Sequence, residues 1–311
     1  MNCNNALKIK EIIRNALAED IGKCDITAKL LITKTKKARA IIFAQEEGIA
    51  CGISIARLVF KTVDSNIRFI SRIKDGNRIR KGVPLINIQG DALSILLGER
   101  VALNFLSLLS GIATHTRHLV DKANSPGVKI MDTRKTLPGL RELEKYAVRI
   151  GGGHNHRFRL DEMVLIKDNY IKAMSGFLSL KHSLKLRKGK EVDWQNLIKD
   201  IRKGIPSKIK IEVEVKNLNE FRLVLAAKPD IIMLDNMKVK QVKKAVRIRK
   251  NLSNKLLVSH AGRQSLMPWI EASGNINLKN IRAYAQSGVD FISLGSLTKN
   301  AYCLDFSLEI K

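Results

Sequence analysis

The chain has 311 residues, 45% of them hydrophobic and 5% aromatic, which allows one large domain or two modest domains with apolar cores. This composition excludes fibrous and disordered proteins, and charged or polar residues interrupt every apolar run before the roughly 20 residues that a membrane-spanning helix needs. The net charge of +27 favours polyanions, from phosphorylated metabolites to nucleic acid, without choosing between them.

The N-terminal segment and the cysteines indicate the cellular compartment of the protein. The first residues predict an amphipathic helix, and no cleavage site follows it, so we expect no export. The apolar face of that helix consists of Ile9, Ile12, Ile13, Ala16 and Leu17. The four cysteines are Cys3, Cys24, Cys51 and Cys303. Because they form no Cys-x-x-Cys pair, we expect neither a zinc site nor disulfides, and a cytoplasmic protein without membrane association.

Residues 38–90 are short β-rich runs separated by turn signals, which predict a small sheet domain. The runs are ARAIIFAQEEG, NIRFISRIKDGNRIRKG and VPLINIQG. From Leu93 to Gly111 the apolar residues are spaced as on a helix, so one or two helices should follow the sheet.

After Gly127 the pattern changes to aliphatic runs that end in polar residues and precede helical stretches. These runs are VKIMDTRK, MVLIKDN, IKIEVEV, DIIMLDN, WIEASGN and DFISLGS. Repeated strand-then-helix units predict a parallel β/α barrel or an incomplete one.

In such barrels the chemistry lies at the carboxyl ends of the strands. The residues predicted there are Asp132, Arg134, Lys135, Lys167, Asp168, Asn169, Glu214, Asp235, Asn236, Ser273, Gly274 and Gly295. Any one of these polar groups could simply cap a strand in solvent. The whole set at one rim instead favours a site for an anionic ligand. Within residues 209–215, Glu212 and Glu214 alternate with aliphatic residues, so they should face the barrel interior.

Several longer blocks carry a specific resemblance. They are AEDIGKCDIT, GERVALNFLSLLSGIAT, MDTRKTLPGLRELEKYAVRIGGGHNHR, LIKDN, EVEV, MLDNM, EASGNI and VDFISLGSLTKNA. In this order they resemble the quinolinate phosphoribosyltransferase family over nearly the whole chain. The family produces nicotinate mononucleotide, pyrophosphate and CO2 from quinolinate and phosphoribosyl pyrophosphate, a step of NAD biosynthesis.

The resemblance implies an α/β fold with an N-terminal α/β sandwich domain and an incomplete parallel β/α barrel. The sandwich would cover residues 1–111, joined by residues 300–311, and the catalytic barrel residues 112–299. It also implies a homodimer or larger assembly, in which the N-terminal domain of one subunit helps to close the barrel of its neighbour.

The resemblance further implies the binding residues. The quinolinate carboxylates would be held by Arg134, His156, Arg157, Lys167 and, from the partner subunit, Arg100, and Thr133 would also bind substrate. Phosphoribosyl pyrophosphate would be bound by Lys135, Glu214, Asp235, Ser273, Gly274, Gly295 and Lys299. Lys135, Glu214 and Asp235 would be catalytic. The two acids also suit Mg²⁺, held directly or indirectly, because loss of pyrophosphate leaves an oxocarbenium-like sugar that a nearby carboxylate stabilises.

Three features depart from the family pattern. Tyr170 follows Lys-Asp-Asn where the family has His, and Lys299 stands where many relatives have His. Residues 256–269, LLVSHAGRQSLMPW, look like an insertion. Tyr170 puts the local geometry in doubt, whereas Lys299 keeps a hydrogen-bond donor.

Two other interpretations stay open. A paralogue on the same scaffold, such as the molybdenum-transport-associated one, would act on another acceptor, although Arg134, His156, Arg157 and Lys167 together argue against it. A nucleic-acid-binding protein on a retired enzyme scaffold would explain the charge. The basic residues are spread evenly, so we expect only non-specific attraction to nucleic acid. His154 and His156 on their glycine-rich turn have no ordered third ligand, which makes a metal pair a weak alternative.

Overall fold

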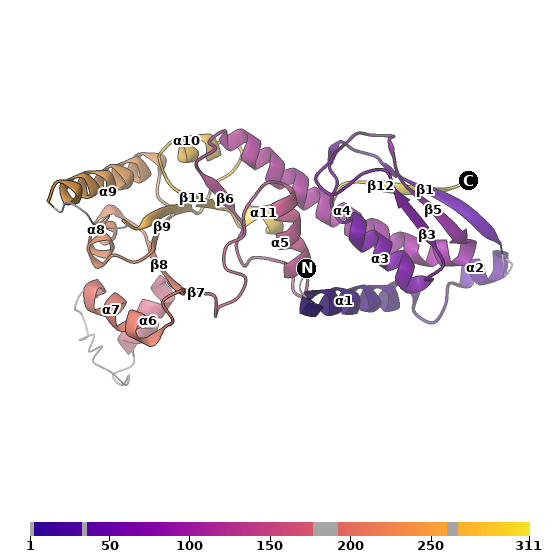
Figure 1. The fold of residues 1–311 in the computed structure, drawn as a ribbon, viewed down its shortest axis with the longest axis horizontal. Helices are drawn as coiled ribbons and strands as arrows, with labels where there is room; N and C mark the ends of the chain where they lie inside the picture. Colours follow the sequence, from indigo (N-terminus) through magenta and orange to yellow (C-terminus); the bar gives the residue numbers. More distant parts are fainter. Residues whose placement is uncertain (1–2, 33–35, 177–191, 260–266) are drawn as a thin grey trace. The chain divides into compact units, whose positions relative to one another are not determined.

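The computed structural model describes residues 3–32, 36–176, 192–259 and 267–311, which form two compact units (Figure 1). Unit 1 comprises Met1–Val120, Lys135–Asn155 and Gly295–Lys311, and unit 2 comprises Asp121–Arg134 and His156–Leu294. Unit 1 therefore takes in residues on both sides of position 111, and the domain boundaries expected from the sequence stay a prediction.

Unit 1 contains a four-stranded antiparallel sheet in the order β12-β1-β5-β3. Its strands are β1 (Lys37–Ala44), β3 (Arg68–Ser71), β5 (Pro84–Asp91) and β12 (Phe306–Ile310). A second, two-stranded sheet joins β2 (Gly48–Ile49) to β4 (Arg78–Ile79). In β1 the side chains of Ala40, Ile42 and Ala44 are buried at every second position, which confirms the predicted sheet domain.

Three helices accompany this sheet in the first part of the chain: α1 (Cys3–Ile21), α2 (Ile26–Leu31) and α3 (Ile53–Val63). In α1, Ile9, Ile13 and Leu17 are buried at intervals of four residues, as predicted for its apolar face. This face turns toward the core, because α1 packs against α3.

One long helix, α4 (Ala92–Ala123), belongs to unit 1 except for its last three residues. Among the described residues, α4 alone has the length and composition of a membrane-crossing helix, and half of its most apolar window is buried in the protein. Two of its buried hydroxyls bind the chain around β2: Thr114 Oγ1 accepts from the Ile49 N–H at 2.8 Å, and Ser110 Oγ from the Cys51 N–H at 3.0 Å. The helix is therefore tied into the core of unit 1 by polar as well as apolar contacts.

Gly111 lies in the middle of α4 because the C-terminal segment crosses the helix at that point. A Cβ placed there would overlap the backbone carbonyl of Tyr302. The Leu304 N–H donates to the Ser107 carbonyl, at 3.1 Å, one turn away. The absence of a side chain thus lets the last residues reach β1, where β12 joins the sheet. Two further helices of unit 1 are α5 (Arg141–Ile150) and α11 (Ser296–Lys299).

Unit 2 is an incomplete parallel β/α barrel. Its strands are β6 (Lys129–Met131), β7 (Met163–Ile166), β8 (Lys210–Val215), β9 (Ile231–Asp235), β10 (Trp269–Ser273) and β11 (Phe291–Ser293). They pair in the order β6-β11-β10-β9-β8-β7, all parallel, and among the described residues no ladder joins β6 to β7. The six predicted strands and the predicted fold class are confirmed.

The helices of unit 2 follow the strands (Figure 1). They are α6 (Asp168–Gly176), α7 (Trp194–Gly204), α8 (Leu218–Ala227), α9 (Val239–Ser259) and α10 (Ile281–Ala285). The start of the expected insertion at 256–269 belongs to α9, and its end begins β10. Its central part, residues 260–266, lies outside the described residues.

At the amino-terminal edge of the barrel, the same arrangement of an aspartate, a strand N–H and an arginine occurs twice. Asp230, just before β9, accepts from the Ile211 N–H of β8 at 2.6 Å and pairs with Arg202 of α7. Asp290, just before β11, likewise accepts from the Ile270 N–H of β10 at 2.7 Å and pairs with Arg249. Each aspartate therefore joins a strand, its neighbour and a helix at the end opposite the predicted rim.

Replacing Asp230 by Ala should lower the free energy of unfolding by about 1–3 kcal/mol. The change leaves the Ile211 N–H without its acceptor and Arg202 without its carboxylate. Asp161, which pairs with Arg159 on the surface with 69% of its side chain exposed, provides the matched control. Its Ala variant should change stability by less than about 0.5 kcal/mol. Urea denaturation measures both, and equal losses would contradict the structural role of Asp230.

Candidate active site

The carboxyl ends of the parallel strands in unit 2 carry most of the predicted site residues. β6 is followed by Asp132, Thr133 and Arg134, β7 by Lys167, β9 ends at Asp235, and β10 ends at Ser273 before Gly274. Glu214 is the last residue but one of β8. Because all six strands run in the same direction, these residues share one edge of the barrel. The structure brings them together as predicted, while their individual roles stay predictions.

Amide hydrogen bonds join the ends of β9 and β10. The Asn236 N–H donates to the Ser273 carbonyl at 2.8 Å, and Asn275 Nδ2 donates to Asn236 Oδ1 at 2.9 Å. Asn236 Nδ2 in turn donates to Asp235 Oδ2, also at 2.8 Å. Asn236, Gly274 and Asn275 all have positive φ, so the two loops fold tightly over the strand ends. This arrangement fixes the Asp235 carboxylate.

The next two strands are joined by an ion pair. Lys167 Nζ, at the end of β7, is bonded to Glu214 Oε2 of β8. The lysine is half-exposed, whereas only 9% of the Glu214 side chain is exposed. The sequence assigned these residues to different substrates, and the structure makes them direct partners.

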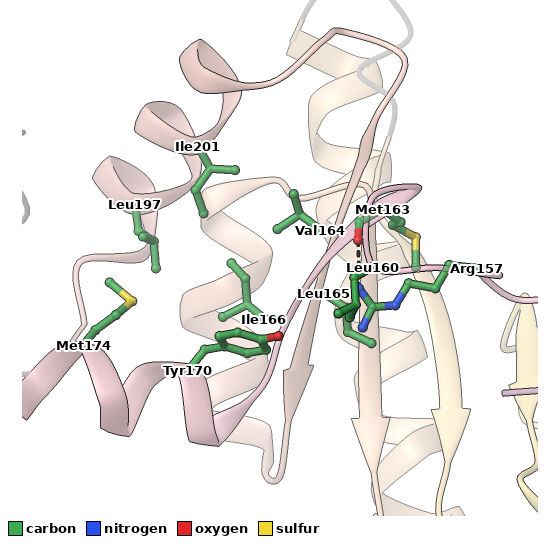
Figure 2. Close-up of a pocket in the computed structure, with 10 residues that line it drawn as sticks. All are labelled: Arg157, Leu160, Met163, Val164, Leu165, Ile166, Tyr170, Met174, Leu197 and Ile201. Carbon is green, nitrogen blue, oxygen red and sulfur yellow. Dashed lines mark hydrogen bonds between the residues drawn. The ribbon is translucent and has the colours of Figure 1, made fainter. Parts of the chain in front are cut away.

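Arg134, which follows β6, and Arg157 are close enough for their charges to interact. Burial, followed by the positive charge of Arg134, lowers the pKa of Arg157. The Arg157 side chain is held by a bond from Nη1 to the Met163 carbonyl, at 2.9 Å (Figure 2). Like charges at short range destabilise each other, so an anion bound between Arg134 and Arg157 would be favoured.

Arg157 and Tyr170 also line an apolar pocket of about 280 Å³ (Figure 2). Its other walls come from β7, α6 and α7: Leu160, Met163, Val164, Leu165, Ile166, Met174, Leu197 and Ile201. With a single cationic side chain among aliphatic ones, this pocket suits no dianion. Tyr170 is 52% exposed on the first turn of α6, so its phenol is placed near Arg157 without being buried.

A histidine and two glutamates meet inside the barrel. His156 Nε2 lies 3.1 Å from Glu212 Oε2 of β8 and 3.6 Å from Glu271 Oε2 of β10. Both glutamates are fully buried, and the histidine side chain is 7% exposed. The His156 backbone N–H donates to Asp132 Oδ1 at 2.9 Å, and Nδ1 accepts from the Arg157 N–H at 2.8 Å. Nδ1 and the backbone N–H of His156 are therefore hydrogen-bonded within the chain, and Nε2 lies between two carboxylates.

In this cluster of His156, Glu212 and Glu271, the pKa values of His156 and Glu212 are both raised. Burial lowers the pKa of His156, but its contacts with Glu212 and Glu271 outweigh burial and raise the pKa to about 10. Burial and then the charge of Glu271 raise the pKa of Glu212 to about 7. The three groups therefore titrate as one unit, in which the charge of the His156 ring and the charges of the two carboxylates depend on one another.

Four predicted residues belong to unit 1: Arg100, Lys135, Gly295 and Lys299. Lys135 and α11 lie together, because Thr298 Oγ1 donates to the Lys135 carbonyl at 2.6 Å. The loop after Lys135 is held by Glu144, whose Oε1 accepts from the Leu137 N–H at 3.2 Å. Burial raises the pKa of Glu144 to about 7.

The comparisons with known proteins agree over the whole chain. Residues 25–110 match the family model of the quinolinate phosphoribosyl transferase N-terminal domain, and residues 112–309 match that of its C-terminal domain. The chain belongs to the quinolinate phosphoribosyltransferase family. Probable nicotinate-nucleotide pyrophosphorylase [carboxylating] of Methanocaldococcus jannaschii is 40% identical over 302 residues, covering 96% of each chain. The Bacillus subtilis protein of the same name is 36% identical and covers 98% of this chain and 94% of its own.

Solved structures of this phosphoribosyltransferase family have the same fold. The nicotinate-nucleotide pyrophosphorylase from Francisella tularensis superposes with a TM-score of 0.83 at 35% identity, over 98% of this chain and 96% of its own. The Ehrlichia chaffeensis protein of that name superposes with a TM-score of 0.81 at 36% identity, over 97% of this chain and 98% of its own.

Sequence reasoning missed the part that Glu212 and Glu271 play in this phosphoribosyltransferase. A signal was present for both. Glu212 alternates with aliphatic residues on the predicted inward face, and Glu271 interrupts the aliphatic run of β10. A carboxylate in the middle of a buried strand requires a partner, since an isolated buried charge is costly. Only the fold shows that both acids share His156.

Replacing Gly274 by Ala should destabilise the protein by about 1–3 kcal/mol through the loops over β9 and β10. Its φ is +86°, and an added Cβ would lie 2.9 Å from the Asn236 backbone nitrogen. Gly204, at the end of α7, has ordinary φ, and a Cβ added there would meet no atom within 4 Å, so Gly204→Ala is the control. Denaturant midpoints measure both variants. A Gly274→Ala protein as stable as the control would show that the loops are not tightly packed.

Proposed function

We propose that this protein transfers the phosphoribosyl group of phosphoribosyl pyrophosphate to quinolinate and releases pyrophosphate and CO2, forming nicotinate mononucleotide for NAD biosynthesis. Family membership supports the reaction. The observation that carries its assignment to this site is the charge interaction between Arg157 and Arg134, which follows β6, together with Lys167 directly after β7. Three cations in this part of the barrel suit an acceptor with two carboxylates.

The acceptor's shape explains why arginines are used. Quinolinate is a planar dicarboxylate, and a guanidinium offers two parallel donors that match a carboxylate. Arg134 and Arg157 would bind these groups, and Lys167 would add a point charge. Anion binding to Lys167 would compete with its bond to Glu214, so substrate binding and the position of that acid are coupled.

The remaining strand ends would bind phosphoribosyl pyrophosphate. As the C–O bond to pyrophosphate breaks, positive charge develops at the anomeric carbon while the quinolinate nitrogen forms the new bond. Glu214 and Asp235 would stabilise that charge, and Lys135 and Lys299 would bind phosphate oxygens. The backbone around Ser273, Gly274 and Gly295 would lie against the phosphates.

Mg²⁺ fits the donors at this edge. Glu214 and Asp235 come from adjacent strand ends, and each carboxylate has a second oxygen besides the one bonded to Lys167 or Asn236. Carboxylate oxygens are the ligands that Mg²⁺ prefers. A bound Mg²⁺ would neutralise charge on the leaving pyrophosphate. We propose these two acids as its ligands, directly or through water.

The decarboxylation needs little from the protein. After transfer the ring nitrogen is positive, so the electron pair left on C2 when CO2 departs is stabilised by the neighbouring charge. A proton then replaces CO2 at C2. The side chains around Arg134 and Arg157 orient the ring and exclude water.

The direct test uses quinolinate labelled in one carboxylate, with phosphoribosyl pyrophosphate and Mg²⁺. Label in the 2-carboxylate should appear as CO2 in equal amount to nicotinate mononucleotide, and label in the 3-carboxylate should stay in the product. Nicotinate should react with a kcat/KM at least about 10³-fold lower, because one carboxylate leaves part of the cationic pocket unpaired. Comparable turnover of nicotinate, or no labelled CO2, would overturn the proposed function.

Removing the charge of Glu214 or Asp235 should reduce catalysis without weakening quinolinate binding. Glu214→Gln and Asp235→Asn keep the side-chain size, so kcat should fall on the order of 10²-fold through loss of charge stabilisation. Calorimetric titration of quinolinate alone should give a nearly unchanged Kd for Asp235→Asn and a Kd no higher than that of the wild type for Glu214→Gln, which releases Lys167 from its ion pair, while Arg134→Ala and Arg157→Ala should raise the Kd. Acid variants that lose quinolinate binding yet keep normal kcat would refute this division.

We also propose a homodimer or larger assembly in which Arg100 reaches the site of the neighbouring subunit. Mixing Arg100→Ala with Lys135→Ala subunits at equal amounts should then restore about a quarter of wild-type activity. Half of the dimers are mixed, and each mixed dimer has one intact site. Each variant reassociated with itself is the control. Verified mixed dimers without activity would place Arg100 in the site of its own subunit.

A further inference from the structure

The segment between β6 and α5 carries Lys135 on an exposed loop of unit 1. Lys135 and residues 137–139 are all exposed. The Leu140 N–H donates to the Leu137 carbonyl at 3.2 Å, and the residues between them are Pro138 and Gly139, whose φ is +80°. Proline followed by a glycine of positive φ is the pattern of a type II turn. Exposed loops are ordinarily the more mobile parts of a protein, so a binding residue at this place needs support.

Thr298 joins Lys135 to the helix that carries a second predicted phosphate-binding lysine. The Thr298 hydroxyl donates to the Lys135 carbonyl at 2.6 Å, and Thr298 itself is buried. Lys299 is the next residue of α11, which begins directly after Gly295. The hydrogen bond therefore holds together two segments that are far apart in the sequence, one with Lys135 and one with Lys299.

Two side chains of α5 hold the residues that follow Lys135. Arg141 Nε donates to Thr136 Oγ1 at 3.0 Å, and Glu144 Oε1 accepts from the Leu137 N–H at 3.2 Å. Glu144 is fully buried, and its Oε2 has no hydrogen-bond partner among the described residues. Burying a carboxylate in this way is costly, and the bond to Leu137 is what this acid contributes to the loop. Because α5 packs against α11, the supports from the two helices belong to one packed unit.

We infer that Thr298 and Glu144 are positioning residues for Lys135, and that they hold its backbone so that Lys135 and Lys299 bind the phosphates of one phosphoribosyl pyrophosphate molecule. This inference rests on the proposed function, because Lys135 is the group that would meet that substrate. A lysine places a point charge on a long flexible side chain, so a fixed backbone limits the entropy lost when the ammonium group binds a phosphate. Loosening this backbone should weaken the binding of phosphoribosyl pyrophosphate more than that of quinolinate.

The hydroxyl of Thr298 is tested by a matched pair of variants, Thr298→Val and Thr298→Ser. The measurement is the calorimetric Kd of phosphoribosyl pyrophosphate with Mg²⁺ and phthalate, whose ring has two adjacent carboxylates but no nitrogen to react. Thr298→Val should raise this Kd about five-fold through loss of one hydrogen bond, and Thr298→Ser should stay within about two-fold of the wild type. An unchanged Kd for Thr298→Val would overturn the inference.

Thr62→Val is the control for that pair. Thr62 Oγ1 makes the same kind of bond, to the Leu58 carbonyl at 2.7 Å, on an exposed part of α3. This variant should bind phosphoribosyl pyrophosphate as the wild type does, because its hydroxyl supports no predicted binding residue. A rise in Kd equal to that of Thr298→Val would show that loss of any such hydroxyl has the same effect, against a specific role for Thr298.

A double-mutant cycle shows whether Thr298 acts through Lys135. Lys135→Ala should raise the Kd of phosphoribosyl pyrophosphate more than about ten-fold, because it removes a charged contact. In the Lys135→Ala background Thr298→Val should have no further effect, whereas a general loss of structure would weaken binding in either background. Effects that multiply, or a Lys135→Ala protein that binds as the wild type does, would overturn the inference.

Glu144 supplies a second pair of variants, which decides the matter if Thr298→Val does not fold. Glu144→Gln keeps an oxygen that accepts from the Leu137 N–H, and Glu144→Met has a similar size but no acceptor. The Kd of phosphoribosyl pyrophosphate should stay within about two-fold of the wild type for Gln and rise about five-fold for Met, while that of quinolinate should change less than about two-fold for both. Equal Kd values for the two variants would contradict positioning through this bond.

Steady-state kinetics give the same distinction in the working enzyme. Thr298→Val and Glu144→Met should raise the KM for phosphoribosyl pyrophosphate with a smaller change in kcat, since the substrate reacts normally once bound. A fall in kcat at unchanged KM would contradict the inference. Failure of the wild-type protein to bind phosphoribosyl pyrophosphate at all would instead reject the proposed function, so the two failures are distinguishable.

Discussion

Glu212 and Glu271 are both fully buried, and each has an oxygen within 3.6 Å of the same nitrogen of His156. Two carboxylates cannot both stay ionised in such a place without compensation, because desolvation and mutual repulsion act in the same direction. The protein reduces this cost by a raised pKa of Glu212 and by the imidazole of His156, which lies between the two carboxylates. The imidazole ring consequently lies between an acid of β8 and an acid of β10.

The two edges of the barrel have separate tasks. At the amino-terminal edge, Asp230 and Asp290 each bind a neighbouring strand and an arginine from a helix. At the carboxyl edge lie Arg134 after β6, Lys167 after β7 and Glu214 near the end of β8. Stability is concentrated where no chemistry is expected, so the rim can carry like charges that would otherwise weaken the fold.

The barrel and its rim could be predicted from the sequence because parallel strands are covered on both faces. Their aliphatic runs end in a polar residue at the point where the strand meets solvent, which located Lys167 and Asp235 correctly. The extent of helix α4 was harder to predict from the sequence. Its apolar spacing was followed only as far as Gly111, since a glycine that makes room for a crossing segment looks the same in sequence as one that ends a helix.

The inner cluster shows a second limit of sequence reasoning. Alternation placed Glu212 on the inward face, but nothing local indicates that it meets Glu271 and His156, which lie far away in the chain. The family resemblance assigned His156 to the substrate, and the fold places its ring between Glu212 and Glu271. Contacts of this kind depend on the order in which the strands pair, which no single segment encodes.

These contacts together predict one arrangement of substrate and protein, which a crystal structure of the complex with quinolinate would test most directly. The two carboxylates should lie within hydrogen-bond distance of the guanidinium groups of Arg134 and Arg157. A quinolinate bound elsewhere, or one whose carboxylates contact neither arginine, would contradict it.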